Sequence, residues 1–216
     1  MSDVSKLMGR IDAEFAAAEK SIKAFQQEQV AAHQGRERRM ETFQKVCDQL
    51  REVWKPRLEA LAKRFGERVS VKPKVTAAER AAEFAFTSPL AEILLKFSAT
   101  TDYEVHNLVL NYDLHVLPIL MKFEPHANAE FALDKVDPEA VGRWFDDRIV
   151  DFVKTYLALH QNEYYLKGKT VTDPISGTQF PKYAAADKVE HQGQTYYFIG
   201  TETRREFQKQ KGLPVT

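Results

Sequence analysis

Cysteine is almost absent from this sequence, and neither sign of charge is in excess. The 216 residues include one cysteine, Cys47, so an internal disulfide or a zinc site of several cysteines cannot form within one chain. Lys and Arg together number 31, as do Asp and Glu, which leaves no basic field to hold a nucleic-acid backbone. We therefore expect a protein of a reducing compartment that does not bind nucleic acid.

Long hydrophobic runs and glycine-rich loops are also missing. No stretch approaches the roughly 20 apolar residues that cross a bilayer, and residues 1–5 lack the apolar core of a secretory signal. The nine glycines are scattered singly, so the sequence has no glycine-rich phosphate loop and disfavours a nucleotide-dependent enzyme. We expect a soluble, cytoplasmic protein with no membrane partner.

The first segment, residues 1–66, carries a helical pattern. Its apolar residues recur in steps of four and three, close to a heptad repeat, in two runs: Leu7, Ile11, Phe15, Ala18, Ile22 and Phe25, then Met40, Phe43, Cys47, Leu50, Trp54, Leu58, Leu61 and Phe65. Between them, residues 26–39 are almost all polar and fit either the turn of a hairpin or a solvated stretch of one long helix. Pro56 would kink the second run, and Gly66 is a helix stop. The pattern predicts a coiled-coil-like arm that forms a homo-oligomer, most simply a homodimer.

The period changes to two in the second segment, residues 67–168. Alternate residues are apolar in three stretches, which is typical of antiparallel strands with one buried face: Phe84 and Phe86; Ile93, Leu95 and Phe97; Leu108, Leu110, Tyr112, Leu114 and Val116. Residues 69–75, with Pro73, predict an edge strand, and residues 129–133 a further one. The Asp137-Pro138-Glu139 sequence predicts the start of a helix that covers the sheet and ends near Gly168.

The third segment, residues 169–216, is short and rich in turns. It contains the turn sequence DPISG at 173–177, a hairpin pattern over 189–198 that closes at Gln192-Gly193, and a helical pattern over 201–211. The three segments together predict an α+β fold. We expect an N-terminal helical arm or hairpin, a central antiparallel sheet with a covering helix, and a small C-terminal α+β module.

The third segment resembles a known family. DPISG at 173–177, HQGQTYYF at 191–198 and TRREF at 203–207 are similar, in order and approximate spacing, to the YHS domain, a small module related to treble-clef-like metal-binding folds. Family members commonly carry cysteines at the positions that match Ser176, Ile199 and Thr203. Because hydroxyl and aliphatic side chains are not thiolate ligands, the metal role that the resemblance implies is not carried over. A folded docking surface is the function that would remain.

Seven residues are the candidate docking surface and core of this YHS-like module: Asp173, Ser176, His191, Tyr196, Tyr197, Phe198 and Phe207. We expect Asp173 to cap its turn and His191 to be a solvated hairpin residue. Strand alternation predicts that Tyr196 and Phe198 form a core with Phe207, while Tyr197 faces the 137–168 helix or a partner. No metal or other cofactor is expected, because Asp173 and His191 alone do not make a closed site.

No complete catalytic set is visible elsewhere. The carboxylates Asp146, Asp147 and Asp151 alternate with basic residues at helical spacing, which predicts an ion-paired, solvated face. Cys47 falls in the apolar seam and is expected to be a core residue. We put forward no catalytic residue.

These observations predict a non-enzymatic interaction or assembly protein with a self-associating helical arm, a docking module and a possible protein partner. One alternative is a metal-handling protein of YHS type that uses ligands other than cysteine. Another is a small-molecule carrier or unfamiliar enzyme with a pocket between the central sheet and the 137–168 helix. A buried polar cluster around Tyr112, Asp113 or His115 in a cavity would support that last alternative.

Overall fold

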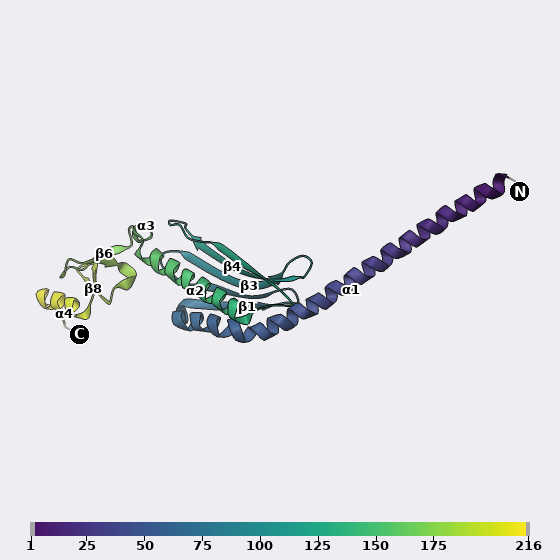
Figure 1. Ribbon diagram of the computed structural model, residues 1–216. Coiled ribbons are helices and arrows are strands. Elements are labelled where there is room, and N and C mark those ends of the chain that lie inside the picture. Colours follow the sequence, from purple (N-terminus) through teal and green to yellow (C-terminus); the bar gives the residue numbers. More distant parts are fainter. Residues whose placement is uncertain (1–2, 215–216) are drawn as a thin grey trace.

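The molecule has an elongated helix at one end, a sheet covered by helices in the middle and a small module at the other end (Figure 1). The structure is a computed structural model that describes residues 3–214. It has the α+β architecture that the sequence predicts. Among the described residues, no helix is both long and apolar enough to cross a membrane.

The first element, α1 (Asp3–Phe65), is one continuous helix and not a hairpin. The polar stretch at 26–39 remains helical because most of its residues are Gln, Glu, Ala and Arg, which are good helix formers. Pro56 lies inside the helix, and α1 changes direction where it runs along the sheet (Figure 1). The short 3-10 helix η1 (Gly66–Arg68) follows, and Gly66 adopts a positive φ of 57° as expected for a helix stop.

Five antiparallel strands form the central sheet in the order of the sequence: β1 (Val69–Val75), β2 (Arg80–Phe86), β3 (Glu92–Thr101), β4 (Asn107–Leu117) and β5 (His126–Ala132). Phe84 lies opposite Leu95, which lies opposite Leu114, so the alternating apolar residues gather on one face. β1 is an edge strand, as Pro73 predicts. β5 begins earlier than the sequence analysis placed it, and it pairs with β4 from His126 onward.

The buried face of the sheet is covered by α2 (Pro138–Gln161) and by the second half of α1 (Figure 1). The ring of Phe65 on α1 lies 4.7 Å from that of Phe86 on β2 and 5.9 Å from that of Phe152 on α2, between centroids. Phe43, Cys47, Leu50 and Leu61 of α1 belong to the same core. The helix that we assigned to a separate segment ending at residue 66 therefore shares its core with the sheet.

A glycine allows α1 and α2 to approach closely. A Cβ atom at Gly142 would lie 2.8 Å from Nη2 of Arg57 and 3.5 Å from Cγ1 of Val53, both on α1. Arg57 in turn pairs with Asp146 of α2 at 2.8 Å. The two helices are thus held side by side by an ion pair, beside a point where side chains of α1 lie directly against the backbone of α2.

The covering helix begins as expected but ends earlier. Asp137 caps α2, and its carboxylate accepts a hydrogen bond from the amide of Glu139 at 2.9 Å. The helix ends at Gln161 and not near Gly168, because Asn162 is extended and its side chain caps the next short helix, α3 (Glu163–Leu166). α3 buries Tyr165, whose hydroxyl donates a hydrogen bond to the carbonyl of Pro118 at 2.6 Å.

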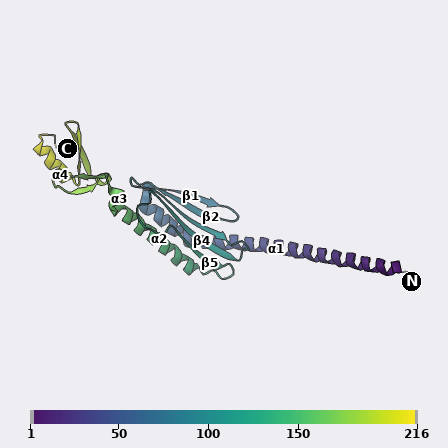
Figure 2. The same cartoon turned by 90° about the horizontal axis from the view of Figure 1, so that it is seen from above.

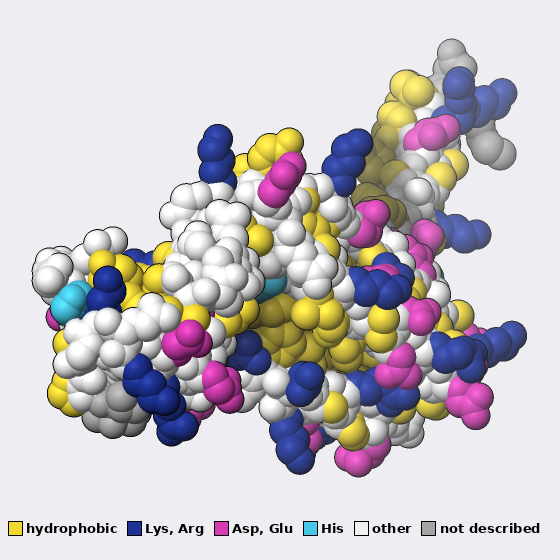
Figure 3. Space-filling view, turned by 90° about the vertical axis from the view of Figure 1, so that its left-hand side faces the viewer, with side chains coloured by type: hydrophobic (Ala, Val, Ile, Leu, Met, Phe, Trp, Pro, Cys, Tyr) yellow, Lys and Arg dark blue, Asp and Glu magenta, His cyan; other side chains and the backbone are white. Residues whose placement is uncertain are grey.

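The C-terminal module consists of β6 (Thr170–Thr172), β7 (Gln179–Pro181), the 3-10 helix η2 (Lys182–Ala184), β8 (Asp187–His191), β9 (Gln194–Phe198) and α4 (Thr201–Gln210). β8 and β9 form the expected hairpin, and Gln192 and Gly193 both have positive φ, as a type I′ turn requires. The module lies beyond the end of α2, away from the arm (Figure 2). Hydrophobic side chains remain visible in a hollow beside it, with Lys and Arg side chains nearby (Figure 3).

Candidate functional site

Asp173 is the centre of the C-terminal module. Its side chain is completely buried. Oδ1 accepts hydrogen bonds from the amides of Ile175 at 2.8 Å and Ser176 at 3.1 Å. Oδ2 accepts from the amide of Ile199 at 2.9 Å and from the hydroxyl of Thr203 at 2.7 Å. One carboxylate thus joins the turn after β6, the end of β9 and the first turn of α4.

The three positions that the YHS resemblance matches to cysteines meet at this carboxylate. Ser176 and Ile199 contribute backbone amides, and Thr203 contributes its side chain. Sequence reasoning expected Asp173 to cap its turn, which is confirmed by its bonds to Ile175 and Ser176. It did not foresee the two bonds to the distant residues.

The hydrogen bonds to Asp173 decide its protonation state. Burial raises the pKa of the carboxyl group, but the donors from Ile199, Thr203, Ile175 and Ser176 outweigh burial, and the pKa lies below its ordinary value. The group is therefore an ionised acceptor at neutral pH and does not act as a proton donor. Its arrangement is that of a structural cross-link.

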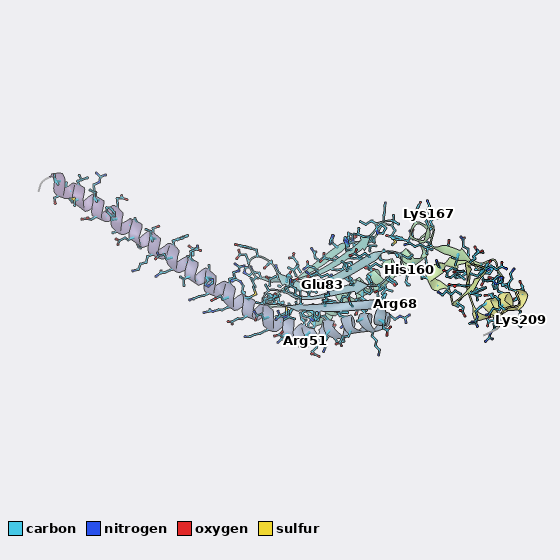
Figure 4. All side chains as sticks on the ribbon, turned by 180° about the vertical axis from the view of Figure 1, so that it is seen from behind. Arg51, Arg68, Glu83, His160, Lys167 and Lys209 are labelled. Carbon is cyan, nitrogen blue, oxygen red and sulfur yellow. The ribbon has the colours of Figure 1, made fainter. Side chains whose placement is uncertain are left out.

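The aromatic residues of the module form the small core that alternation predicted. The ring centroids of Tyr196 and Phe198 lie 4.7 and 5.3 Å from that of Phe207, and Phe198 and Phe207 are buried. Tyr197 points to the other face, where the ammonium group of Lys182 lies 4.8 Å from its ring centroid. Contact with α2 comes instead from Tyr183, whose ring lies edge-on to that of His160 at 5.9 Å. Figure 4 shows His160 where α2 meets the module.

The remaining candidate, His191, is half-buried on the hairpin, and its ring lies 6.4 Å from that of Phe207. It is thus less solvated than we expected. The hydroxyl of Ser176 donates to that of Thr178 at 3.1 Å. Within residues 3–214, no group of three or more His, Cys, Asp and Glu side chains is arranged to hold a metal ion.

The polar cluster that would have supported a pocket under the 137–168 helix does not form. Tyr112 is buried on the face that α2 covers, with its ring 5.6 Å from that of Phe97. Asp113 and His115 alternate with Tyr112 on β4 and lie on the opposite face of the sheet, where they line a second hollow of about 720 Å³ that is not under α2. There, Asp113 pairs with His126 at 2.8 Å, a contact that sequence reasoning missed because β5 was placed too late.

The other candidates behave as ordinary structural residues. Asp151 pairs with Arg148 of the same helix at 2.8 Å, as the helical spacing predicts, whereas Asp146 pairs with Arg57 of α1. Cys47 is buried, and burial raises the pKa of its thiol to about 12. A thiol with that pKa is not ionised at neutral pH and is a poor nucleophile.

The N-terminal half of α1 presents a different feature, an exposed apolar stripe. Every side chain from residue 4 to residue 34 is exposed, and the arm projects away from the rest of the molecule (Figures 1 and 4). The side chain of Phe15 is 67% exposed, and the other residues of the stripe are also apolar and exposed. We call this stripe the arm seam, and it begins with Met8 in place of Leu7 because Met8 lies seven residues before Phe15: Met8, Ile11, Phe15, Ala18, Ile22 and Phe25.

Comparison with known proteins gives no guide to function. No family model, no curated protein and no solved structure matches the chain.

Proposed function

We propose that this protein is a non-enzymatic assembly protein of the cytoplasm that self-associates through the N-terminal half of α1. Its C-terminal module is proposed as a YHS-like docking unit. The observation that carries the proposal is the arm seam, an apolar stripe on a long helix whose other half is fixed in the core.

The spacing of the arm seam suits a coiled coil. Met8, Phe15 and Ile22 are seven residues apart, and Ile11, Ala18 and Phe25 form a second set with the same spacing, so the two sets correspond to the a and d positions of a heptad. After the polar positions Gln29 and Arg36, the same seven-residue period reaches Phe43 and Leu50, which are buried against the sheet. The apolar side chains on the second half of α1 are thus buried within the chain, whereas those on the first half need a partner to bury them.

A second copy of the chain is the proposed partner, because an isologous pair of identical stripes buries both at once. The flanking heptad positions carry Asp12, Glu14, Glu19 and Glu28. Between two copies these carboxylates repel weakly, by a few tenths of a kcal/mol per pair, whereas each buried large apolar side chain contributes about 1.5–3 kcal/mol. Salt screens the repulsion, so self-association should strengthen as ionic strength rises.

The docking role of the C-terminal module is supported by its architecture. Asp173 joins the three matched positions at one point, so the module has an internal cross-link in the place where the family resemblance implies metal ligands. The surface of the module retains the partly exposed Tyr183 and Ile199 as apolar contacts for a protein partner.

The test is the mass of the full chain in solution, measured by sedimentation equilibrium over a range of protein and salt concentrations. We expect a dimer that dissociates on dilution and strengthens with salt. The double variant Phe15→Glu/Phe25→Glu should be monomeric. The matched control Ala13→Glu/Gln27→Glu adds the same charge at heptad positions opposite the seam and should remain dimeric.

Two results would contradict the proposal: a parent chain that is monomeric at every concentration, or a seam variant with the same mass as the parent. A parent that is monomeric alone but binds a basic helix, with affinity that falls as salt rises, would identify a different partner for the same seam.

A further inference from the structure

A cleft lies between the second half of α1 and the β1–β2 edge of the sheet. Its volume is about 550 Å³, within the range of roughly 300–1,000 Å³ that is typical of small-molecule sites. Trp54 and Leu58 of α1 form one wall, and Val71 of β1 and Phe84 of β2 form the other. Phe97 of β3 also lines the cleft, so apolar side chains line it on several sides.

The cleft exists because α1 leaves β1 uncovered beyond Val69, which packs against the core. Val71 lies opposite Phe84 in the β1–β2 ladder, and both face the buried side of the sheet. Phe84 is buried, yet Val71 is 40% exposed, and Val75 on the same face of β1 is 72% exposed. The core-facing side of the edge strand is thus open to solvent. Exposed apolar residues that adjoin the core are unusual and often mark a binding site.

Positive charge gathers at the rim of this apolar surface. Arg51, Lys55, Lys74 and Arg80 line the cleft, against the two carboxylates Asp48 and Glu59. Figure 4 shows Arg51 on the part of α1 that runs along the sheet. Lys55 pairs with Glu59 at 3.7 Å and Lys74 pairs with Glu79 at 2.7 Å, so the positive charge that a ligand meets at the mouth of the cleft comes mainly from Arg51 and Arg80. These two guanidinium groups favour an anionic group there.

Arg80 is the most enclosed of these cations. Its side chain is 17% exposed, and Nη1 donates to the carbonyls of Thr76 and Glu79, which fix the position of the guanidinium group. The carboxylate of Asp48 is 3.7 Å from Nη2 and is itself 73% exposed, so it neutralises Arg80 only weakly. A guanidinium held in this way beside an apolar wall is suited to a carboxylate, because it can offer charge-assisted hydrogen bonds.

A small molecule fits this cleft better than an added peptide strand does. Pro73 has no amide hydrogen to offer at the middle of the edge strand, and Lys72 and Lys74 flank it. Proline and lysine are the residues with which edge strands discourage pairing with another strand.

We propose that the cleft binds a carboxylate amphiphile with a single hydrocarbon chain. The chain lies between Trp54, Leu58 and Phe84, and the carboxylate is held by Arg80. This site is separate from the arm seam, and its occupation does not depend on self-association.

Binding is measured with dansyl-labelled undecanoic acid added to the full chain, both by dansyl fluorescence and by energy transfer from tryptophan. We expect saturation at one probe per chain, displacement by dodecanoic acid and at least tenfold weaker displacement by dodecylamine. Trp54→Phe should reduce the energy transfer, because Trp54 lines the cleft, and the transfer that remains should come from Trp144, whose ring lies 6.3 Å from that of Phe97.

Two variants and a control locate the site. Val71→Trp fills the cleft from an exposed position and should weaken binding at least tenfold. The control Ser70→Trp places the same ring on the opposite face of β1 and should bind as the parent does. Arg80→Gln should weaken the binding of dodecanoic acid about tenfold and leave the binding of neutral dodecanol unchanged. Loss of folding could not produce that difference, because it would weaken the binding of both ligands.

Absence of saturable probe binding to the parent chain would overturn the proposal. So would equal binding by Val71→Trp and the parent, or displacement by dodecylamine as effective as that by dodecanoic acid. If Arg80→Gln weakens dodecanoic acid and dodecanol equally, the carboxylate is not held by Arg80 and the assignment of the ligand's headgroup is wrong.

Discussion

The hydroxyl of Thr203 donates a 2.7 Å hydrogen bond to the carboxylate of Asp173, across 30 positions of the chain. The same hydroxyl lies 2.9 Å from the carbonyl of Gly200, so Thr203 fixes the first turn of α4 against the turn that Asp173 begins. The pair therefore connects two local structures that no strand ladder within residues 3–214 joins directly.

Loss of the Asp173 carboxylate should destabilise the C-terminal module. We expect Asp173→Asn to lower the free energy of unfolding by about 2–4 kcal/mol. The amide nitrogen of asparagine would face buried hydrogen-bond donors that are bound to a carboxylate oxygen in the parent chain. Thr203→Val should cost about 1.5–3 kcal/mol through the loss of one hydrogen bond to a charged group. Thr203→Ser keeps the hydroxyl and is the control. Urea unfolding, followed by the NMR signals of residues 196–207, measures these costs. If all three variants are as stable as the parent chain, the proposed role of Asp173 is wrong.

The same carboxylate should make the module sensitive to acid. Its pKa in the folded chain is lowered from an ordinary value near 3.8, so its contribution to stability is present above that value and is lost as the pH falls through the folded pKa. The parent should therefore lose module stability on acidification more steeply than Asp173→Asn does. Glu79 and Asp102 of the central domain also have lowered pKa values, which is why the comparison uses signals of the module alone.

The aromatic core of the module should be essential to its folding. Phe198 and Phe207 are buried against each other, and replacement of either by Ala should cost about 3–5 kcal/mol. Limited proteolysis should then cut the chain soon after Gly168. Ile199→Ala removes a side chain that is nearly half exposed and is the matched control. A C-terminal region as resistant as the parent's would show that these two rings do not hold it together.

Charged substitutions along α1 should have two distinct effects. Leu50→Glu and Leu61→Glu place a carboxylate in the core beneath the sheet and should unfold the central domain. Ile22→Glu lies on the exposed arm and should leave the melting temperature of the central domain unchanged. Thermal unfolding followed by circular dichroism separates the two groups. Similar melting temperatures for Leu50→Glu and Ile22→Glu would mean that the second half of α1 does not form part of the core.

Local sequence signals determined most of the secondary structure. The alternation of apolar residues located β2, β3 and β4, and the Asp137-Pro138-Glu139 sequence located the start of α2. Gln192-Gly193 located the turn of the hairpin, because its backbone requires positive φ at both positions. These signals succeed because caps, tight turns and strand alternation depend on neighbours that are close in the chain.

The tertiary structure decided what each apolar face packs against. The stripe of α1 predicts burial of one side of a helix, but its pattern is the same whether the partner is a sheet or another helix. Phe43 and Leu50 pack beneath the sheet, whereas Phe15 and Phe25 of the same stripe stay exposed, because the sheet extends along only half of the helix.

Long-range geometry also decided the two sites. Sequence placed Asp173 in a turn, but two of its four donors come from residues 26 and 30 positions away, which only the folded module brings within hydrogen-bond distance. Nothing in the sequence placed Arg80 and Val71 at a common cleft, since the cleft arises from the position of α1 relative to the edge of the sheet. The sequence by itself determined the elements and their apolar faces, and the packing of those elements determined where a carboxylate is buried and where an apolar surface stays open.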